Sequence, residues 1–349
     1  TPARLAGMLR DAEDGDPIAY LELAEAMEEK DPDYLGVLGT RKRAVSQLEI
    51  TVTAASDESA DEDLAEFLRA TLLEREELED ELFDMLDAVG KGFSATEILW
   101  ETSEREWRPA RLEWRDPRWF RFDRVDGRTL RLLDEGGQET PLSPFKFIVH
   151  VHKAKSGLPI RGGLARPIAW AYLFKNYAVK DWATFLEAYA QPWRLGKYHA
   201  GATEDEKRKL LSAVGGLSSD AAAIIPEGMA IDMLEMGTKG ATSDAYEKNA
   251  DFWNRRMQIA VLGQTLTTEV KGGSFAAAKV HDAVRDDIKR ADAKQLAATL
   301  NRDLVRPMID LNKGPQRRYP RLVIGLRESV NLKEYSEAMG AMIDRGLQV

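Results

Sequence analysis

The chain has 349 residues, of which 44% are hydrophobic and 31% are charged, so it is long enough for two or three domains with buried cores. It contains no cysteine, which excludes disulfides and sites in which cysteine binds zinc or an iron–sulfur cluster. No apolar run approaches the ~20 residues that a membrane-spanning helix needs, and no secretory leader is recognisable, so we expect no membrane among the partners.

Most of the net charge of −10 comes from one segment. Residues 57–87 contain 14 acidic residues and two arginines, a balance of −12, while the other 47 basic and 45 acidic residues sum to +2. A sequence-specific DNA-binding protein typically carries a concentrated basic face. No stretch of this sequence is dominated by basic residues in that way, so the composition argues against that class of protein.

The N-terminal part is predicted to be mainly helical. Residues 17–45 have the apolar spacing of a helix, and residues 47–54 alternate Leu, Ile and Val as a strand does. An acidic pair of helices follows over residues 59–89 and is ended by glycines. Its first turn has Ser59 with Glu62 three residues later, which is the pattern of a capping box.

Residues 93–152 are predicted to form strands, because short aromatic and β-branched segments alternate with Asp-Pro, Asp-Gly and Gly-Gly turns. The run DRVDGRTLRLL predicts a hairpin through Asp126 and Gly127. His150 and His152 share one face of a predicted strand, at a spacing that could ligate a metal. No carboxylate is paired with them in the sequence, so a histidine pair without a ligand is the favoured interpretation.

Residues 105–131 contain nine arginines interleaved with three tryptophans. Arginine and aromatic side chains together can form a surface on which nucleic-acid bases stack. Acidic residues share this window, however, and the arginines fall on both faces of the presumed strands. We therefore favour ion-paired, solvated strands over a nucleic-acid interface.

Long helices dominate the second half of the chain. A helix over residues 164–191, about 35–40 Å long, has Pro167 near its first turn and Pro192 at its end. Its aromatic residues do not form one stripe, which indicates burial by several neighbours, including other subunits. The remaining predicted elements are short strands with one small helix capped by Thr203 over 192–240, long helices over 244–262 and 275–309, a strand within 317–328 and a helix over 332–349.

The connection between the second and third long helices is rich in glycine and threonine. It does not match a phosphate-binding P-loop, because Lys271 precedes the two glycines and a helix rather than a strand leads into it. Small polar residues predict a mobile connection that touches a featureless surface. Its candidate site residues are Thr265, Thr267, Thr268, Lys271, Gly272, Gly273 and Ser274. The motifs of a nucleophile elbow and of an H-E-x-x-H zinc site are absent, so we assign no catalytic residue, cofactor or metal.

Three stretches resemble, in the same order, the portal proteins of Mu-like bacteriophages and prophages. They are DPDYLGVLGTRKRAV (31–45), GFSATEILW (92–100) and GGLARPIAWAYLFKNYAVKDWATFLEAYAQPWRLGKY (162–198). The resemblance covers about residues 17–310 and includes the run MQIAVLGQTLTTE. It implies a ring, usually dodecameric, at one vertex of a capsid, through which the genome is packaged and ejected. Members of the family usually extend further at both ends.

The resemblance implies an α+β fold, the phage portal fold with an α/β wing, long stem helices, a small clip domain and a helical crown base. The portal plan assigns the wing to 1–160, stem helices to 161–191 and 241–263, the clip to 192–240, a tunnel loop facing DNA to 264–274, a helix leading to the crown to 275–310, and an incomplete crown base to 311–349.

The resemblance also implies a set of partners: further copies of the chain, double-stranded DNA without sequence preference, the terminase large subunit, head–tail connector or neck proteins, and the major capsid and scaffold proteins. It implies a location in the virion and, during assembly, in the host cytoplasm, for a conduit without enzymatic activity. Each neutralised phosphate adds salt-dependent affinity and hence friction, so a small polar loop with one lysine suits a conduit. A nucleic-acid-processing enzyme and another capsid or neck component stay open as alternatives.

Overall fold

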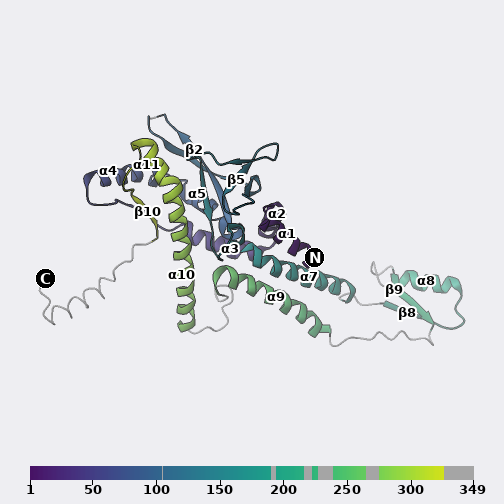
Figure 1. Cartoon of the computed structure of the whole chain (residues 1–349). Coiled ribbons are helices and arrows are strands. Elements are labelled where there is room, and N and C mark those ends of the chain that lie inside the picture. The colour runs from purple at the N-terminus through teal and green to yellow at the C-terminus, as the bar shows by residue number, and fades with distance from the viewer. Residues whose placement is uncertain (104, 190–193, 216–221, 227–238, 265–274, 326–349) are drawn as a thin grey trace, which may run out of the picture. The chain divides into compact units, whose positions relative to one another are not determined.

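The computed structural model describes residues 1–103, 105–189, 194–215, 222–226, 239–264 and 275–325 (Figure 1). The chain divides into two compact units, a larger one of residues 1–171 with 255–349 and a smaller one of residues 172–254. Two long helices, α7 (Ala165–Tyr189) and α9 (Lys239–Leu262), have residues in both units.

Helices form most of the larger unit. They are α1 (Pro2–Glu13), α2 (Ile18–Lys30), α3 (Pro32–Ser46), α4 (Ser59–Leu68), α5 (Leu78–Met85), α6 (Ala88–Lys91), α10 (Phe275–Leu300) and α11 (Arg306–Lys313). Two π-helical turns extend helices: η1 (Arg69–Leu73) follows α4, and η4 (Asn301–Val305) joins α10 to α11. Short 3₁₀ turns are η2 (Pro117–Trp119) and η3 (Pro159–Arg161).

The strands of the larger unit form three antiparallel sheets. β2 (Phe93–Glu101) lies between β3 (Arg108–Arg115) and β7 (Phe147–Val151). A second sheet has the order β4 (Phe120–Phe122), β5 (Leu130–Leu133) and β6 (Glu139–Pro141), and β1 (Ile50–Thr53) pairs with β10 (Arg321–Ile324). The pairing of β4 with β5 confirms the predicted hairpin through Asp126 and Gly127. The core between the helices and the central sheet includes Tyr20, Tyr34, Leu82, Met85 and Phe93, all fully buried.

The predicted helix over residues 17–45 is two helices, α2 and α3. A carboxylate oxygen of Asp31 accepts hydrogen bonds from the backbone N–H groups of Asp33 and Tyr34, each at 3.1 Å. Asp31 therefore caps a new helix, and Pro32 fits its first position because that position needs no N–H donor. Apolar spacing does not reveal the boundary between α2 and α3, because both helices bury apolar side chains.

The predicted capping box at Ser59 is wrong. The helix α4 begins at Ser59 itself, and its cap residue, Glu58, makes no side-chain capping bond. The hydroxyl of Ser56 instead accepts from the backbone N–H of Glu58 at 3.3 Å and donates to the carboxylate of Asp61. Ser56 thus ties the residue before the helix to its first turn through Asp61, without capping a helical N–H group.

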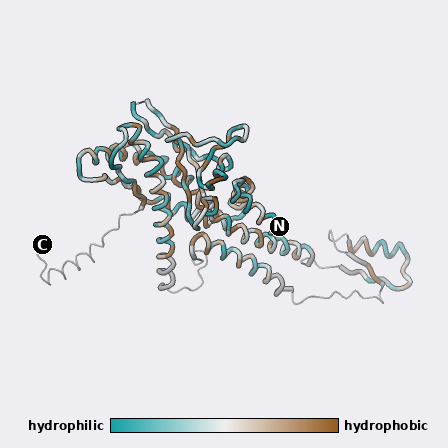
Figure 2. Tube along the Cα trace, in the orientation of Figure 1, coloured by the Kyte–Doolittle hydropathy of each residue, from teal (hydrophilic) through white to brown (hydrophobic). Residues whose placement is uncertain are grey.

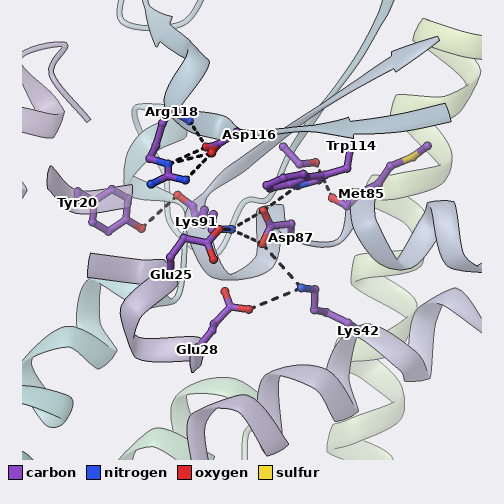
Figure 3. A network of polar contacts seen from close by, with 11 residues as sticks. Tyr20, Glu25, Glu28, Lys42, Met85, Asp87, Lys91, Trp114, Asp116 and Arg118 are labelled. Carbon is purple, nitrogen blue, oxygen red and sulfur yellow. Dashed lines mark hydrogen bonds and ion pairs between the residues drawn. The ribbon is translucent and has the colours of Figure 1, made fainter. Parts of the chain in front are cut away.

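A buried ionic network joins α2, α3 and α6 to β3 (Figure 3). A carboxylate oxygen of Asp87 lies 2.7 Å from Nζ of Lys91 and accepts a hydrogen bond from the indole nitrogen of Trp114 at 3.1 Å. Lys91 also contacts the carboxylate of Glu25, and Nζ of Lys42 lies 3.8 Å from Asp87. Lys91 and Asp87 are 2% and 5% exposed, so their charges compensate each other away from solvent.

The smaller unit contains the strands β8 (Arg194–Tyr198) and β9 (Ala222–Pro226), which pair in parallel, and the helix α8 (Glu204–Gly215), which packs on both. The start of α8 is a reciprocal cap: the backbone N–H of Glu206 donates to the hydroxyl of Thr203, and the N–H of Thr203 donates to the carboxylate of Glu206 at 2.8 Å. The predicted cap at Thr203 is confirmed. The sequence-predicted last helix, over 332–349, lies outside the described residues.

Within the smaller unit, α7 and α9 contact each other through aromatic rings. Phe174 stacks on Trp253 with ring centroids 5.3 Å apart, and Phe185 lies 5.6 Å from Tyr246. Apolar and polar residues alternate along both helices rather than forming one apolar run (Figure 2). None of the helices within the described ranges is both long enough and apolar enough to cross a membrane.

Candidate functional site at the α9–α10 connection

The residues of the predicted loop site lie outside the described part of the chain. These are Thr265, Thr267, Thr268, Lys271, Gly272, Gly273 and Ser274. The structure describes the chain up to Gln264 and the packing of α10 from residue 283 onward. The site is therefore built here from the residues that hold the base of the connection.

The helix α9 ends in a turn that requires glycine. Gly263 has a φ of +72°, which L side chains rarely adopt, and its N–H donates to the carbonyl of Ile259 at 3.0 Å. A Cβ atom at this position would lie 2.9 Å from side-chain carbons of both Val284 and Ile288 on α10. Gly263 thus ends α9 and lets the end of this helix approach α10 closely.

Arg41 joins three helices at this turn. Its guanidinium group donates to both carboxylate oxygens of Asp292, at 2.7 and 3.0 Å, and to the carbonyl oxygen of Val261 at 2.7 Å. Arg41 belongs to α3, Asp292 to α10 and Val261 to the last turn of α9. Bidentate pairing of this kind fixes orientation as well as charge, and the Asp292 side chain is 2% exposed. We call Arg41, Asp292 and the Val261 carbonyl the loop anchor.

Several polar side chains beside the loop anchor are buried without a hydrogen-bond partner in the described residues. They include both ring nitrogens of His152 and both amide atoms of Gln264, residues that are 2% and 3% exposed. Nδ1 of His152 lies 3.7 Å from the Asp292 carboxylate, too far for a hydrogen bond. Burial lowers the pKa of His152 to about 4, although Asp292 opposes the shift, so the ring is neutral near pH 7.

His150 lies on the same side of the molecule and is buried like His152. Its Nδ1 is 3.0 Å from the hydroxyl of Thr299 on α10, and burial lowers its pKa to about 3. Within the described ranges, no group of three or more histidine and acidic residues is arranged to hold a metal ion. Through His150 beside Thr299 and His152 beside Asp292, the end of β7 and the residue after it pack against α10.

Replacing Arg41 with lysine should lower the free energy of unfolding by about 1–2 kcal/mol, because an ammonium group lacks the planar fork that holds Asp292 and Val261 together. Urea unfolding measures this loss, and hydrogen exchange at the Gly263 amide should become faster. The matched control is Arg43→Lys, since Arg43 is exposed on the same helix. Equal effects of the two substitutions would contradict the anchoring role.

The arginine-rich strands are ion-paired, as the sequence interpretation favoured. The pairs are Arg108–Glu106, Arg115–Glu97, Arg118–Asp116, Arg121–Asp16, Arg124–Glu139 and Arg131–Asp123, with distances between 2.6 and 3.9 Å. Three of these six carboxylates, those of Glu106, Asp116 and Asp123, lie within eight positions of their arginine in the sequence. Carboxylates therefore offset the charge of six of the nine arginines in residues 105–131.

Sequence reasoning missed the loop anchor. Arg41 and Asp292 are separated by 251 positions, and neither stands in a motif. The sequence feature nearest to this contact is Gly263, which follows a helical pattern. It predicts where α9 ends, but not which residues bind the end of α9.

The fold is shared with chains of known structure. A chain from the virion of a native gene transfer agent particle matches with a TM-score of 0.55 at 12% identity, covering 94% of this chain and 91% of that one. A chain from the neck of the native particle, computed with C12 symmetry, also gives a TM-score of 0.55 at 13% identity, over 93% and 89% of the two chains. At this identity the likeness defines the fold class, an α+β fold found in a phage-like particle.

Closer relatives define the family. The Mu-like prophage FluMu protein gp29 of Haemophilus influenzae is 38% identical over all of this chain and 68% of its own length, and the portal protein of Escherichia phage Mu is 38% identical over 97% and 67%. The model of the family described as portal protein of Mu bacteriophage matches residues 21–349. The chain belongs to this family of portal proteins, as the three quoted stretches indicated.

Proposed function

We propose that the chain is one subunit of a ring at a capsid vertex, a conduit for double-stranded DNA during packaging and ejection. The observation that carries this proposal is its 38% identity, over nearly the whole chain, to the portal protein of phage Mu. The C12 symmetry of the neck structure with the same fold supports a ring, and a dodecameric one. A separate terminase supplies the energy, and terminase and neck proteins dock on the assembled ring.

The domain assignment along the chain follows the domain order of portal proteins. Residues 1–160 form the wing, 161–191 and 241–263 the stem helices, 192–240 the clip, 264–274 the tunnel loop, 275–310 the helix toward the crown and 311–349 the base of the crown. Two observations support the stem assignment. The long helices α7 and α9 stack aromatic rings on each other, and they also leave large apolar side chains uncovered.

Those uncovered side chains fit contacts between neighbouring subunits. Tyr177, Val179 and Leu186 on α7 and Phe252 on α9 are between 39% and 44% exposed in the isolated chain. Clustered exposed apolar side chains on a soluble protein mark interaction surfaces. In a ring with head-to-tail contacts, every such surface is covered by the next subunit.

The tunnel loop contacts DNA weakly in this proposal. Its residues Thr265 to Ser274 are mostly small and polar, with Lys271 the one basic residue. One cation per subunit adds little salt-dependent affinity, so the duplex slides. The loop anchor supports a loop that contacts DNA. It binds the end of α9 to α3 and α10, so that the residues after it can contact the duplex.

The ring is tested by negative-stain images of purified protein, which should show rings with a central hole wide enough for a duplex. The loop is tested by deleting Val270–Ser274, which should impair DNA packaging in a phage assembly assay more than ring formation. The matched control replaces the same five residues with glycine and serine at unchanged length and should package normally. Loss of the ring itself on deletion would assign the loop a purely architectural role.

A further inference from the structure

An open groove of about 680 Å³ in the larger unit is lined by basic residues from two stretches of the chain, 294–306 and 317–324. They are Lys294 on α10, Arg302 in η4, Arg306 at the start of α11, Arg317 and Arg318 in the following connection, and Arg321 on β10. All six side chains are exposed, and no acidic residue lines the groove. In a chain with a net charge of −10, this is a marked local reversal of charge.

These basic side chains are neutralised far less than those of the arginine-rich strands. Lys294, Arg317 and Arg321 have no carboxylate partner in the described part of the chain, and the nearest carboxylate to Arg318 is that of Asp61 at 3.7 Å. Like charges held this close repel one another and oppose folding. Arg302 is the exception, because its guanidinium group pairs with the carboxylate of Asp303 at 2.6 Å. A groove that leaves the other five basic side chains without a close carboxylate fits an anion from outside the described structure.

The spacing of the basic residues matches a polymer of phosphates. Lys294, Ala298, Arg302 and Arg306 follow one another at intervals of four along one continuous helical segment. The distance from the first to the last is about 18 Å at 1.5 Å per residue. One DNA strand carries a phosphate per about 3.4 Å of helix axis, so this row, three of whose four positions are basic, is as long as roughly five phosphates. Arginine side chains bind phosphate oxygens in a bidentate manner.

Two acidic segments of the chain itself are weaker candidates for this groove. Residues 326–349 contain four acidic and three basic residues, too balanced to neutralise six cations. The acidic segment 57–87 already borders the groove within the same chain, through Glu58 and Asp61 beside Arg318. Apart from Arg302, which pairs with Asp303, the other basic side chains of the groove still have no carboxylate partner in the described residues, which favours phosphate over carboxylate as the missing anion.

We propose that this groove binds the phosphodiester backbone of DNA, at a site separate from the tunnel loop. The proposal rests on the proposed function in taking DNA as the ligand. The physical consequence of this groove differs from that of the loop. The five basic side chains other than Arg302 can make about five phosphate contacts, which grip a duplex rather than let it slide. The groove therefore holds DNA that is stationary, whereas the loop meets DNA that moves.

The test compares two double variants of the full chain with the same loss of charge. Arg317→Gln/Arg321→Gln removes two unpaired arginines from the groove, and Arg118→Gln/Arg131→Gln removes two ion-paired arginines from the strands. Binding to a short labelled duplex of arbitrary sequence is followed by fluorescence anisotropy between about 50 and 200 mM salt. Native mass spectrometry records the oligomeric state of each sample.

For the wild type, five phosphate contacts predict that affinity falls roughly 500-fold over this salt range, and for the groove variant, with three contacts, roughly 40-fold. The slope of log affinity against log salt should thus fall by about 1.8 in the groove variant and stay unchanged in the control. Equal slopes for both variants would overturn the proposal. So would loss of the ring with an unchanged slope, which would make the groove an interface between copies. A wild type that forms no ring but shows the slope difference supports the groove and contradicts the proposed function instead.

Discussion

Replacing Asp87 with alanine should lower the free energy of unfolding of the larger unit by about 3–5 kcal/mol, because the substitution leaves buried cations without their counter-charge. Lys91, whose side chain is 3% exposed, would lose a contact of 2.7 Å. Trp114 would lose the acceptor of its indole N–H, and the nearby charge of Lys42 would be compensated less. Figure 3 shows these groups converging on one carboxylate.

The measurement is urea unfolding at neutral pH, with Glu66→Ala as the control. Glu66 pairs with Arg69 at 2.9 Å, but its side chain is 69% exposed, so its loss should cost less than about 1 kcal/mol. A second variant, Asp87→Ala with Lys91→Met, should recover part of the loss, because it removes the orphaned charge as well. A cost for Asp87→Ala no larger than that for Glu66→Ala would show that the network does not stabilise the fold.

The free energy of unfolding should also fall by roughly 4 kcal/mol between about pH 7.5 and pH 5, through His150 and His152 together. Burial lowers the pKa of His150 to about 3 and that of His152 to about 4, from 6.5 in the unfolded chain. His152 faces Asp292 and Arg41, and His150 faces Thr299, with Arg302 as a further charge near it. Neither neighbourhood stabilises a charged ring enough to offset burial.

The direction in which the free energy of unfolding changes with pH follows from proton binding. Below pH 6.5 the unfolded chain takes up a proton on each histidine while the folded chain does not, so stability present above pH 6.5 is lost as the pH falls toward the folded-state pKa values. NMR titration should show both rings neutral at about pH 5. The double variant His150→Gln/His152→Gln should flatten the pH dependence of unfolding, whereas His199→Gln, at an exposed position, should not. An unchanged slope in the double variant would contradict this assignment.

Much of the fold was predictable because its long elements have strong local signals. The helix predicted over 164–191 is observed as Ala165–Tyr189, and the helix predicted over 275–309 is observed as α10, η4 and α11 in succession. Regular apolar spacing and flanking prolines fix such elements without tertiary information. The family likewise followed from contiguous stretches long enough to be specific.

The unpredicted features all depend on contacts between distant segments or on caps. Asp31 divides a continuous helical pattern by capping a new helix, which apolar spacing does not report. The loop anchor pairs Arg41 with Asp292, and the basic groove brings together two stretches of the chain, 294–306 and 317–324, neither of which forms the groove alone. Conversely, six of the nine arginines in the densest run of the sequence are paired with carboxylates, some of them far away in the sequence. Local density of charge is therefore a poor guide to surface potential, because ion pairing is decided in three dimensions.

The position of Arg41 has a mechanical consequence. A pull on the chain beyond Leu262 would load the last turn of α9, whose carbonyl groups have few intrahelical partners. The guanidinium group of Arg41 holds the Val261 carbonyl and the Asp292 carboxylate at the same time. Tension is therefore distributed over α3, α9 and α10 instead of unwinding α9 alone. A displacement of the end of α9 would also displace Arg41 on α3.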